Sequence, residues 1–425
     1  MDTPAEAPPP ERQSTPSPEV IRNRRLALGG LAAGFIALII AIVASCAGGG
    51  GSGSQSSSAV GGGARTTPNH RRPRGPRVHV RQLGTLPAPV QDPATAPLAP
   101  GTVPASSSAT PTGTDTTATS TTPTGSTSGT TDTTGTETTA TTTTGPGAGG
   151  GAPKGGALLL GGLDTGDSSV SSIVLVRVGA KPVASPVGSL PRALHDAAAA
   201  TVGSDVYLFG GGNLEMGSDR IVRVTPGGDS RPAGTLPQPA SDLGATALAG
   251  AAYSVGGYTG SQALRAIVAF HPGGGAQVVA QLPQALRYAA VAAADNAVII
   301  VGGTTGGGSA VRTILRFDPA TNQVRQIGTL PRALTHAAVG VLNGSVYVLG
   351  GRGTAQGSQT RGVLVIDPRT GAVRTAGTLP RPLSDAGAAT VANRILLVGG
   401  RDAGGQVLDS VYSITAGQSP TGVTR

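Results

Sequence analysis

The sequence predicts an all-β protein in which six similar four-stranded antiparallel sheets follow a membrane anchor. Two observations predict the sheets. A Leu-Pro dipeptide recurs along the chain, and in its last five copies a Gly-Gly pair begins 19 residues after the proline. Only 2% of the 425 residues are aromatic and none is Trp, so we expect a core of Val, Leu, Ile and Ala.

The Leu-Pro copies define the repeat. The last four steps between their prolines are 46, 46, 48 and 49 residues. A fixed period of this size is typical of supersecondary units that stack on one another. The six copies are Leu86-Pro87, Leu190-Pro191, Leu236-Pro237, Leu282-Pro283, Leu330-Pro331 and Leu379-Pro380.

Each repeat has the pattern of four strands. An apolar run such as SVYVL ends at each Gly-Gly pair, and residues that tolerate positive φ end strands. A second apolar run precedes it, and Asn343-Gly344 between two such runs predicts a tight hairpin. A third strand follows the pair. Turns at Asp318-Pro319 and Asp367-Pro368 then lead to a fourth.

This pattern resembles the kelch repeat of the galactose oxidase-like superfamily. The matching features are the Gly-Gly pair, the Asp-Pro turns, and a Tyr three residues before the pair at Tyr207, Tyr253 and Tyr347. The resemblance implies a six-bladed kelch-type β-propeller over residues 77–416. The Trp usual on the fourth strand is replaced by Val324 and Val373. Packing between blades is therefore expected to use aliphatic side chains.

The first repeat carries an insertion. Pro87 lies 74 residues before its Gly-Gly pair at Gly161, and the surplus falls at residues 100–154. Thr fills 20 of the 34 positions from 111 to 144, a composition that predicts disorder. We expect this insertion, with or without O-glycosylation, to join the first two strands of blade 1.

The two ends of the repeat region complement each other. The last repeat has only three strands before the tail at 417–425, whereas the strand VHVRQLG at 78–84 precedes the first Leu-Pro and has no blade of its own. We expect it to pair with the last blade as the outer strand and so close the ring, which removes exposed sheet edges.

The N-terminal region predicts a membrane anchor. Residues 26–45 are 20 consecutive uncharged, mostly apolar residues, long enough to span a bilayer as a helix over 26–46. Arg22, Arg24 and Arg25 precede this helix, whereas residues 47–64 contain no Lys or Arg. The positive-inside rule then predicts a disordered cytoplasmic tail at 1–25, a disordered stalk at 47–76, and a propeller outside the membrane.

Two alternatives concern this region. The segment Val43-Ala44-Ser45-Cys46 resembles a bacterial lipobox, which would make Cys46 a lipidated N-terminus. The six arginines within 65–81 either attract anionic lipid or wall polymers or belong to a solvated linker, and the linker is favoured. Only Lys154 and Lys181 of the 31 basic residues are lysine, which favours a GC-rich bacterial genome; together with the predicted anchor, this indicates a bacterial cell-surface protein.

Aligned repeats predict a ring of polar residues at the mouth of the central channel. A cation, a sugar or a peptide amine would suit this ring. Alternatively, its side chains cap the Leu-Pro turns, and this reading is favoured. The fifth position after each proline contributes Asp92, Asp196, Asp242, Tyr288, His336 and Asp385.

The position directly after the proline is expected beside the same mouth. Its arginines are Arg192, Arg332 and Arg381. They would bind a ligand carboxylate or form ion pairs between blades, and ion pairs are favoured. The variable loops after the Gly-Gly pairs rim this face, where recognition usually resides.

Two function classes remain. The favoured one is a non-catalytic binding or scaffold module for a glycan, peptide or protein partner. The alternative, implied by the family resemblance, is a sugar-modifying enzyme of the kelch mutarotase type that uses the Asp and His of the ring. Galactose oxidase chemistry is excluded because it needs a Tyr–Cys crosslink, and the single Cys lies in the anchor.

Other chemistry is not expected. One Cys and five His make a Cys/His zinc site improbable, and we expect neither a metal nor a cofactor. No aromatic platform for bases is present, so nucleic acid is not an expected partner.

Overall fold

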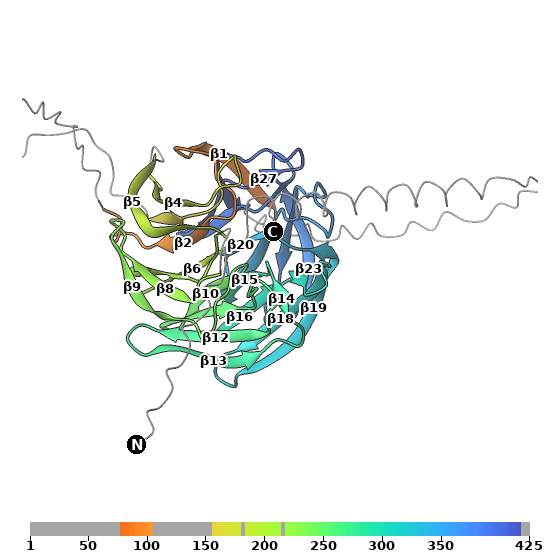
Figure 1. Cartoon of the computed structure of the whole chain (residues 1–425). Helices are drawn as coiled ribbons and strands as arrows, with labels where there is room; N and C mark the ends of the chain where they lie inside the picture. Colours follow the sequence, from red (N-terminus) through yellow and green to blue (C-terminus); the bar gives the residue numbers. More distant parts are fainter. Residues whose placement is uncertain (1–76, 105–154, 180–182, 214–216, 418–425) are drawn as a thin grey trace, which may run out of the picture. The chain divides into compact units, whose positions relative to one another are not determined.

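The computed structural model describes residues 77–104, 155–179, 183–213 and 217–417. Within these ranges the chain forms six four-stranded antiparallel sheets. The innermost strands of successive sheets contact one another around a closed circle. This is a six-bladed β-propeller (Figure 1), so the predicted all-β architecture is confirmed.

The predicted anchor at 26–46, with Cys46, the tail at 1–25 and the stalk at 47–76, lies outside the described residues. So do residues 105–154 of the predicted insertion and residues 418–425 of the C-terminal tail. Where the structure does describe the chain, it has no helix of the length and hydrophobicity that crossing a membrane requires.

The first three blades use consecutive strands. Blade 1 contains β2 (Ala94–Leu98), β3 (Gly156–Leu160), β4 (Val170–Arg177) and β5 (Val183–Leu194). Blade 2 contains β6 (Ala198–Val202), β7 (Asp205–Phe209), β8 (Arg220–Val224) and β9 (Ser230–Thr235). Blade 3 contains β10 (Gly244–Leu248), β11 (Ala251–Val255), β12 (Ala266–His271) and β13 (Gly275–Gln281).

Blade 4 contains β15 (Ala290–Ala294), β16 (Ala297–Val301), β18 (Val311–Asp318) and β19 (Gln323–Leu334). Blade 5 contains β20 (Ala338–Leu342), β21 (Ser345–Leu349), β22 (Gly362–Ile366) and β23 (Val373–Thr378). Blade 6 contains β25 (Gly387–Val391), β26 (Arg394–Val398), β28 (Ser410–Ala416) and β1 (Val78–Thr85). Two short pairs join β14 (Leu286–Arg287) to β17 (Thr304–Thr305) and β24 (Leu383–Ser384) to β27 (Arg401–Asp402).

The first strand closes the propeller as expected. β1 pairs antiparallel with β28, from Val78 opposite Ala416 to Thr85 opposite Ser410. Figure 1 shows β1, in orange, beside the blue C-terminal strands. In blade 1, β2 pairs with β3 in unbroken register from Ala94 opposite Leu160 to Leu98 opposite Gly156. Residues 105–154 therefore lie, in sequence, between two adjacent strands of one sheet.

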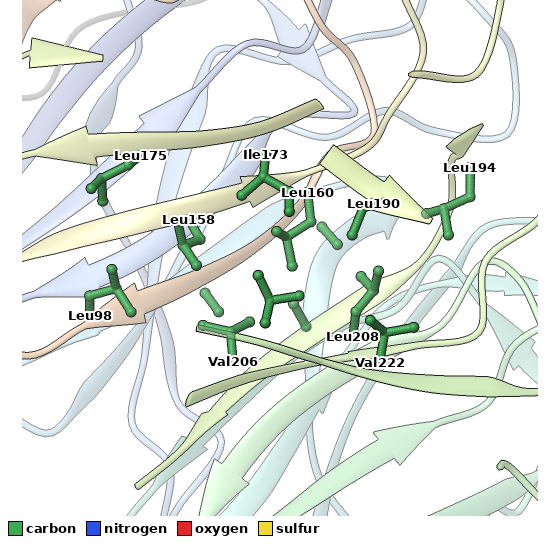
Figure 2. Packing of buried hydrophobic residues seen from close by; sticks show 14 of the residues in the cluster. Leu98, Leu158, Leu160, Ile173, Leu175, Leu190, Leu194, Val206, Leu208 and Val222 are labelled. Atoms are coloured by element: carbon green, nitrogen blue, oxygen red, sulfur yellow. The ribbon is translucent and has the colours of Figure 1, made fainter. Parts of the chain in front are cut away.

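The hydrophobic core is divided among the blade interfaces. Each of six apolar clusters takes side chains from two neighbouring blades. Figure 2 shows the cluster between blades 1 and 2, in which Leu158 and Leu160 lie near Val206 and Leu208. The blades are therefore held together by the same aliphatic burial that stabilises each sheet.

A β-bulge in every outer strand supplies part of this packing. The register of each outer strand shifts by one residue shortly before the Leu-Pro dipeptide, and the extra residue is apolar. All six extra residues pack against the cluster shared with the following blade. They are Leu83, Val187, Ala233, Val279, Ile327 and Ala376. Val324 and Val373, which replace the expected Trp, also pack against core clusters.

The expectation of a purely aliphatic core was wrong in one respect. The propeller's few aromatic rings are concentrated in the core. Phe270 lies 5.0 Å from Tyr207 and 5.6 Å from Phe209 between ring centroids, and Tyr253 lies 5.7 Å from Phe317. Three Phe residues are fully buried, because a few rings fill space between blades that small aliphatic side chains leave open.

Candidate functional site

The Gly-Gly pair fixes where the next blade begins. The second glycine donates its N–H to a carbonyl oxygen of the segment that leads into the following blade, as in Gly211 to Ala240 at 2.9 Å. A Cβ on the first glycine, Gly210, would lie 2.2 Å from that same oxygen. The pattern repeats at all six junctions. Because each accepting residue lies two positions before a ring residue, the repeat signature also positions the ring.

The six predicted ring residues do form a ring. All six have left-handed backbone, with φ from 51° at Asp92 to 59° at Asp242 and Asp385. Five of the six successive backbone links are hydrogen bonds, from the N–H of one ring residue to the carbonyl of the one before it. Left-handed backbone is costly for Tyr and His, and such positions cluster at functional sites.

The ring encloses a cavity of about 120 Å³. Each blade contributes its ring residue and the residue after it. A second cavity of about 410 Å³ lies between the innermost strands and is lined by uncharged, mainly small residues such as Ala292 and Thr246. Charged recognition along the channel is therefore confined to the ring.

Four carboxyl groups share this small space. Burial raises the pKa of Asp92 well above its usual range, and the carboxyls of Asp385, Asp196 and Asp242 raise it further. Burial and then Asp242 likewise raise the pKa of Asp196. Burial also raises the pKa of Asp242 and Asp385, but Arg287 opposes the rise at Asp242, and a hydrogen bond from Ser384 opposes it at Asp385. The ring therefore holds protons more tightly than isolated carboxylates do.

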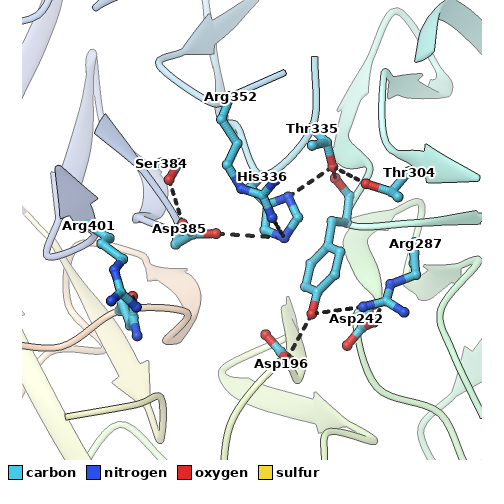
Figure 3. Close-up of polar contacts among 12 residues, drawn as sticks. Asp196, Asp242, Arg287, Thr304, Thr335, His336, Arg352, Ser384, Asp385 and Arg401 are labelled. Carbon is cyan, nitrogen blue, oxygen red and sulfur yellow. Dashed lines mark hydrogen bonds and ion pairs between the residues drawn. The ribbon is translucent and has the colours of Figure 1, made fainter. Parts of the chain in front are cut away.

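Tyr288 and Arg287 organise one side of the ring (Figure 3). The Tyr288 hydroxyl donates to Asp196 Oδ2 at 3.1 Å, and burial raises its pKa, so the phenol stays protonated. Arg287 lies with its Nε 2.7 Å from Asp242 Oδ2. Its guanidinium also lies 4.4 Å from the ring centre of Tyr258 and 4.8 Å from that of Tyr288, in cation–π contact.

His336 is a neutral imidazole on the blade that follows the one carrying Tyr288. Burial, followed by Arg352, lowers its pKa to about 2. Arg352 Nη2 lies 3.1 Å from His336 Nε2, and arginine can only donate, so Nε2 accepts and Nδ1 carries the proton. That proton points to Thr335 Oγ1 at 3.0 Å. The imidazole stacks on Tyr288 with ring centres 3.7 Å apart, and its Nε2 is 3.8 Å from Asp385 Oδ1.

The residue before each ring position forms a second layer that the sequence analysis missed. Each of these residues forms a β-bridge to the residue that follows a Gly-Gly pair, as Thr335 does to Arg352. This layer brings Arg287 to the ring, and its bridge partners Arg352 and Arg401 come from the loops that were expected to rim this face. On the first two blades it brings Gln91 and His195 instead, and His195 Nδ1 contacts Ser169 Oγ at 2.8 Å. These residues could have been identified from the sequence, because each lies one position before a ring residue.

The arginines after the prolines were misplaced. Arg192, Arg332 and Arg381 are exposed, and none of them lines the ring cavity. Arg192 lines a separate cavity of about 350 Å³ near the junction of blades 1 and 2. Arg381 lies 3.6 Å from Asp402 within its own blade. Four residues of extended chain span roughly 13 Å, which separates each arginine from the ring residue that follows it.

The ring residues do not resemble a metal centre. Across the part of the chain that the structure describes, no group of three or more His, Cys, Asp or Glu residues is spaced to hold a metal ion.

Comparison with known proteins agrees with this architecture. The family model of the Kelch motif matches two consecutive repeats, residues 285–331 and 333–380. A solved structure described as "Structure of YjhT" aligns with a TM-score of 0.57 at 13% identity, covering 79% of this chain and 99% of that one. This likeness concerns the fold. No curated protein matches the chain. The matched motifs, the junction repeated six times and the closed circle of blades together show a six-bladed β-propeller that contains kelch motifs at residues 285–331 and 333–380.

Proposed function

We propose that this protein is a membrane-anchored, extracytoplasmic binding or scaffold module whose ring receives part of a glycan, peptide or protein partner. One observation carries the proposal: six polar side chains, one from each blade, converge on a single cavity. Rigid scaffolds that present a few polar groups in a concave site are typical of binding proteins.

The location rests on the sequence. The apolar run at 26–45, the arginines before it and the absence of Lys and Arg from 47–64 favour a single-pass anchor with the propeller outside. A protease added to intact cells is expected to cleave a C-terminal tag and to leave an N-terminal tag untouched. Protection of the C-terminal tag would contradict this orientation. Mass spectrometry of the mature N-terminus distinguishes the helix from lipidation at Cys46.

The binding role is tested by screening the purified full-length chain against glycans, peptides and divalent cations. Asp196→Ala and Asp385→Ala are expected to weaken whatever binds, because both carboxyls line the cavity. Asp229→Ala, in an exposed turn, serves as the matched control. Binding that both ring variants leave unchanged would move the site to the loops or to another surface.

A second candidate is a sugar-modifying enzyme of the mutarotase type. The observation that favours it is the proximity of a neutral imidazole to a carboxyl with raised pKa, His336 and Asp385. Exchange of a proton between a sugar and such a pair would interconvert anomers. NMR exchange spectra of reducing sugars with the wild-type chain and with His336→Gln test this activity. Equal exchange rates in both samples would reject it.

A further inference from the structure

The positive charges around the ring are unevenly distributed. Arg287 lies against Asp242, and the charge of Arg352 opposes the rise in the pKa of Asp385 that burial causes. Asp92 and Asp196, on neighbouring blades 1 and 2, form no ion pair with an arginine in the described residues; Asp196 has only the largely neutral His195 at 3.7 Å. The ring is therefore acidic on the side of these two blades.

The ring has few side-chain hydrogen-bond donors besides the protons that its carboxyls hold. The hydroxyls of Tyr288 and Ser384 donate to Asp196 and Asp385. Asp242 is only 4% exposed, yet its Oδ2 and the adjacent Arg287 Nε are buried without a hydrogen bond, although 2.7 Å separates the two atoms. The ion pair with Arg287 therefore balances the charge of Asp242, whereas no arginine pairs with Asp92 or Asp196 in the described residues.

The composition of the ring indicates which ligand group would supply hydrogen-bond donors to its carboxyls. A ligand carboxylate or phosphate would be repelled by the four carboxyls, and a sugar hydroxyl brings one donor together with acceptors that the ring does not need. A protonated primary amine brings three donors, no acceptor and one positive charge. Its N–H groups form charge-assisted hydrogen bonds of about 2.8 Å with carboxylate oxygens.

The cavity size agrees with an amine head group. Its volume of about 120 Å³ accommodates an ammonium group and its first carbons but no complete sugar ring with its substituents. The stacked rings of Tyr288 and His336 form an uncharged wall of the ring. The remainder of a larger ligand would stay outside the mouth, against the variable loops.

We propose that the group entering the ring is a protonated primary amine, seated against Asp92 and Asp196. This inference rests on the proposed binding function and names its ligand class: an amino sugar, or a lysine side chain or free amino terminus of a peptide. Because the ring carboxyls hold protons tightly, amine binding releases protons and tightens as the pH rises until the amine itself deprotonates.

The test is isothermal titration of the purified full-length chain with ethylammonium, and with glucosamine against glucose and N-acetylglucosamine. Glucosamine is expected to bind roughly tenfold or more tightly than the two uncharged sugars. Asp92→Asn and Asp196→Asn are expected to reduce amine binding by a similar factor, and Asp229→Asn is expected to leave it unchanged. Thermal melts of each variant verify that the propeller remains folded.

The possible results distinguish failure of this inference from failure of the proposed binding function. If glucose and N-acetylglucosamine bind as tightly as glucosamine and still depend on Asp196, the ring is a binding site but amine selectivity is wrong. If neither amine binds while another ligand does so through Asp385, the inference fails and the binding role stands. If Asp92→Asn and Asp196→Asn leave amine binding intact, the seat proposed for the amine is wrong.

Discussion

The backbone N–H of Asp92 donates a hydrogen bond to the carbonyl oxygen of Asp385, 2.8 Å away, and so joins the first blade to the last. Asp242 is linked to Asp196 in the same way, also at 2.8 Å. The ring of side chains therefore rests on five backbone hydrogen bonds between successive blades. Its geometry depends on closure of the whole propeller, since the Asp92 link joins blade 1 to blade 6.

Disruption of the closing strand is expected to destabilise the propeller. Val80 on β1 lies opposite Ile414 and packs against the cluster between blades 5 and 6. Val80→Asp places a carboxylate in this apolar contact and is expected to cost about 1–3 kcal/mol, which lowers the Tm by roughly 2–4 °C per kcal/mol. Differential scanning calorimetry measures the change. His79→Asp, on the exposed face of the same strand, is the control. Equal melting temperatures for the two variants would contradict closure through β1.

The stability of the ring is expected to depend on pH. Burial raises the pKa of Asp92 and Asp196 in the folded state. Their contribution to stability is therefore fully present below the unfolded pKa of about 3.9 and is lost as the pH rises through the raised folded values. Asp92→Asn cannot ionise and avoids this loss. Its Tm relative to wild type is expected to be higher at about pH 8 than at about pH 5.

Melting curves across this pH range provide the measurement. Asp229→Asn, which removes the same charge from an exposed turn, is expected to give a difference from wild type that is nearly independent of pH. A constant difference for Asp92→Asn would mean that its carboxyl titrates normally in the folded protein.

Close approach between inner strands is expected to make Gly244 intolerant of substitution. A Cβ there would lie 2.3 Å from Val291 Cγ2 and 2.8 Å from the Ala289 carbonyl oxygen. Gly244→Ala forces blades 3 and 4 apart locally, at an expected cost of about 1–3 kcal/mol. Gly84→Ala is the matched control, because no atom lies within 4 Å of its new Cβ and its φ is not positive. Urea denaturation compares the two, and similar midpoints would argue against tight packing at this junction.

An ion cluster on Asp295 is expected to contribute to the attachment of blade 5 to blade 4. Its carboxylate lies 3.1 Å from Arg316 Nη1 and 2.7 Å from Arg369 Nη2, which belong to blades 4 and 5. Asp295→Asn leaves the largely buried Arg316 without its charge partner and is expected to cost about 1–3 kcal/mol. Arg369 is 77% exposed, so Arg369→Ala is expected to cost only about 0–1 kcal/mol. Chemical denaturation checks the order of the two effects.

Counting along the repeats located the ring but not its surroundings. The fifth position after each proline identified all six ring residues, because every blade begins at the same junction after a Gly-Gly pair. The same alignment placed Arg192, Arg332 and Arg381 too close to the mouth. An alignment shows which residues are equivalent, but the distance between two aligned positions depends on how the chain is extended between them.

Other features carried weaker signals. Arg287 lies directly before a ring residue, and its interaction with Asp242 depends on where the end of a long side chain lies, which repeat spacing does not specify. The bulges in the outer strands also escaped notice. In the sequence, the main indication of each bulge is a Gly or Ala two residues before the Leu-Pro dipeptide. At Gly328, for example, a Cβ would lie 2.5 Å from the Gly371 carbonyl oxygen of the next blade.

The left-handed backbone at the six ring positions is held by strand junctions and not by the side chains it carries. Asp, His and Tyr occupy it with φ values within a few degrees of one another. Replacement of one residue in one repeat would therefore alter the chemistry of the cavity without rearranging the sheets. Proteins that share this scaffold can therefore differ in the ligand they bind through substitutions at six separate ring positions, each a change of one codon.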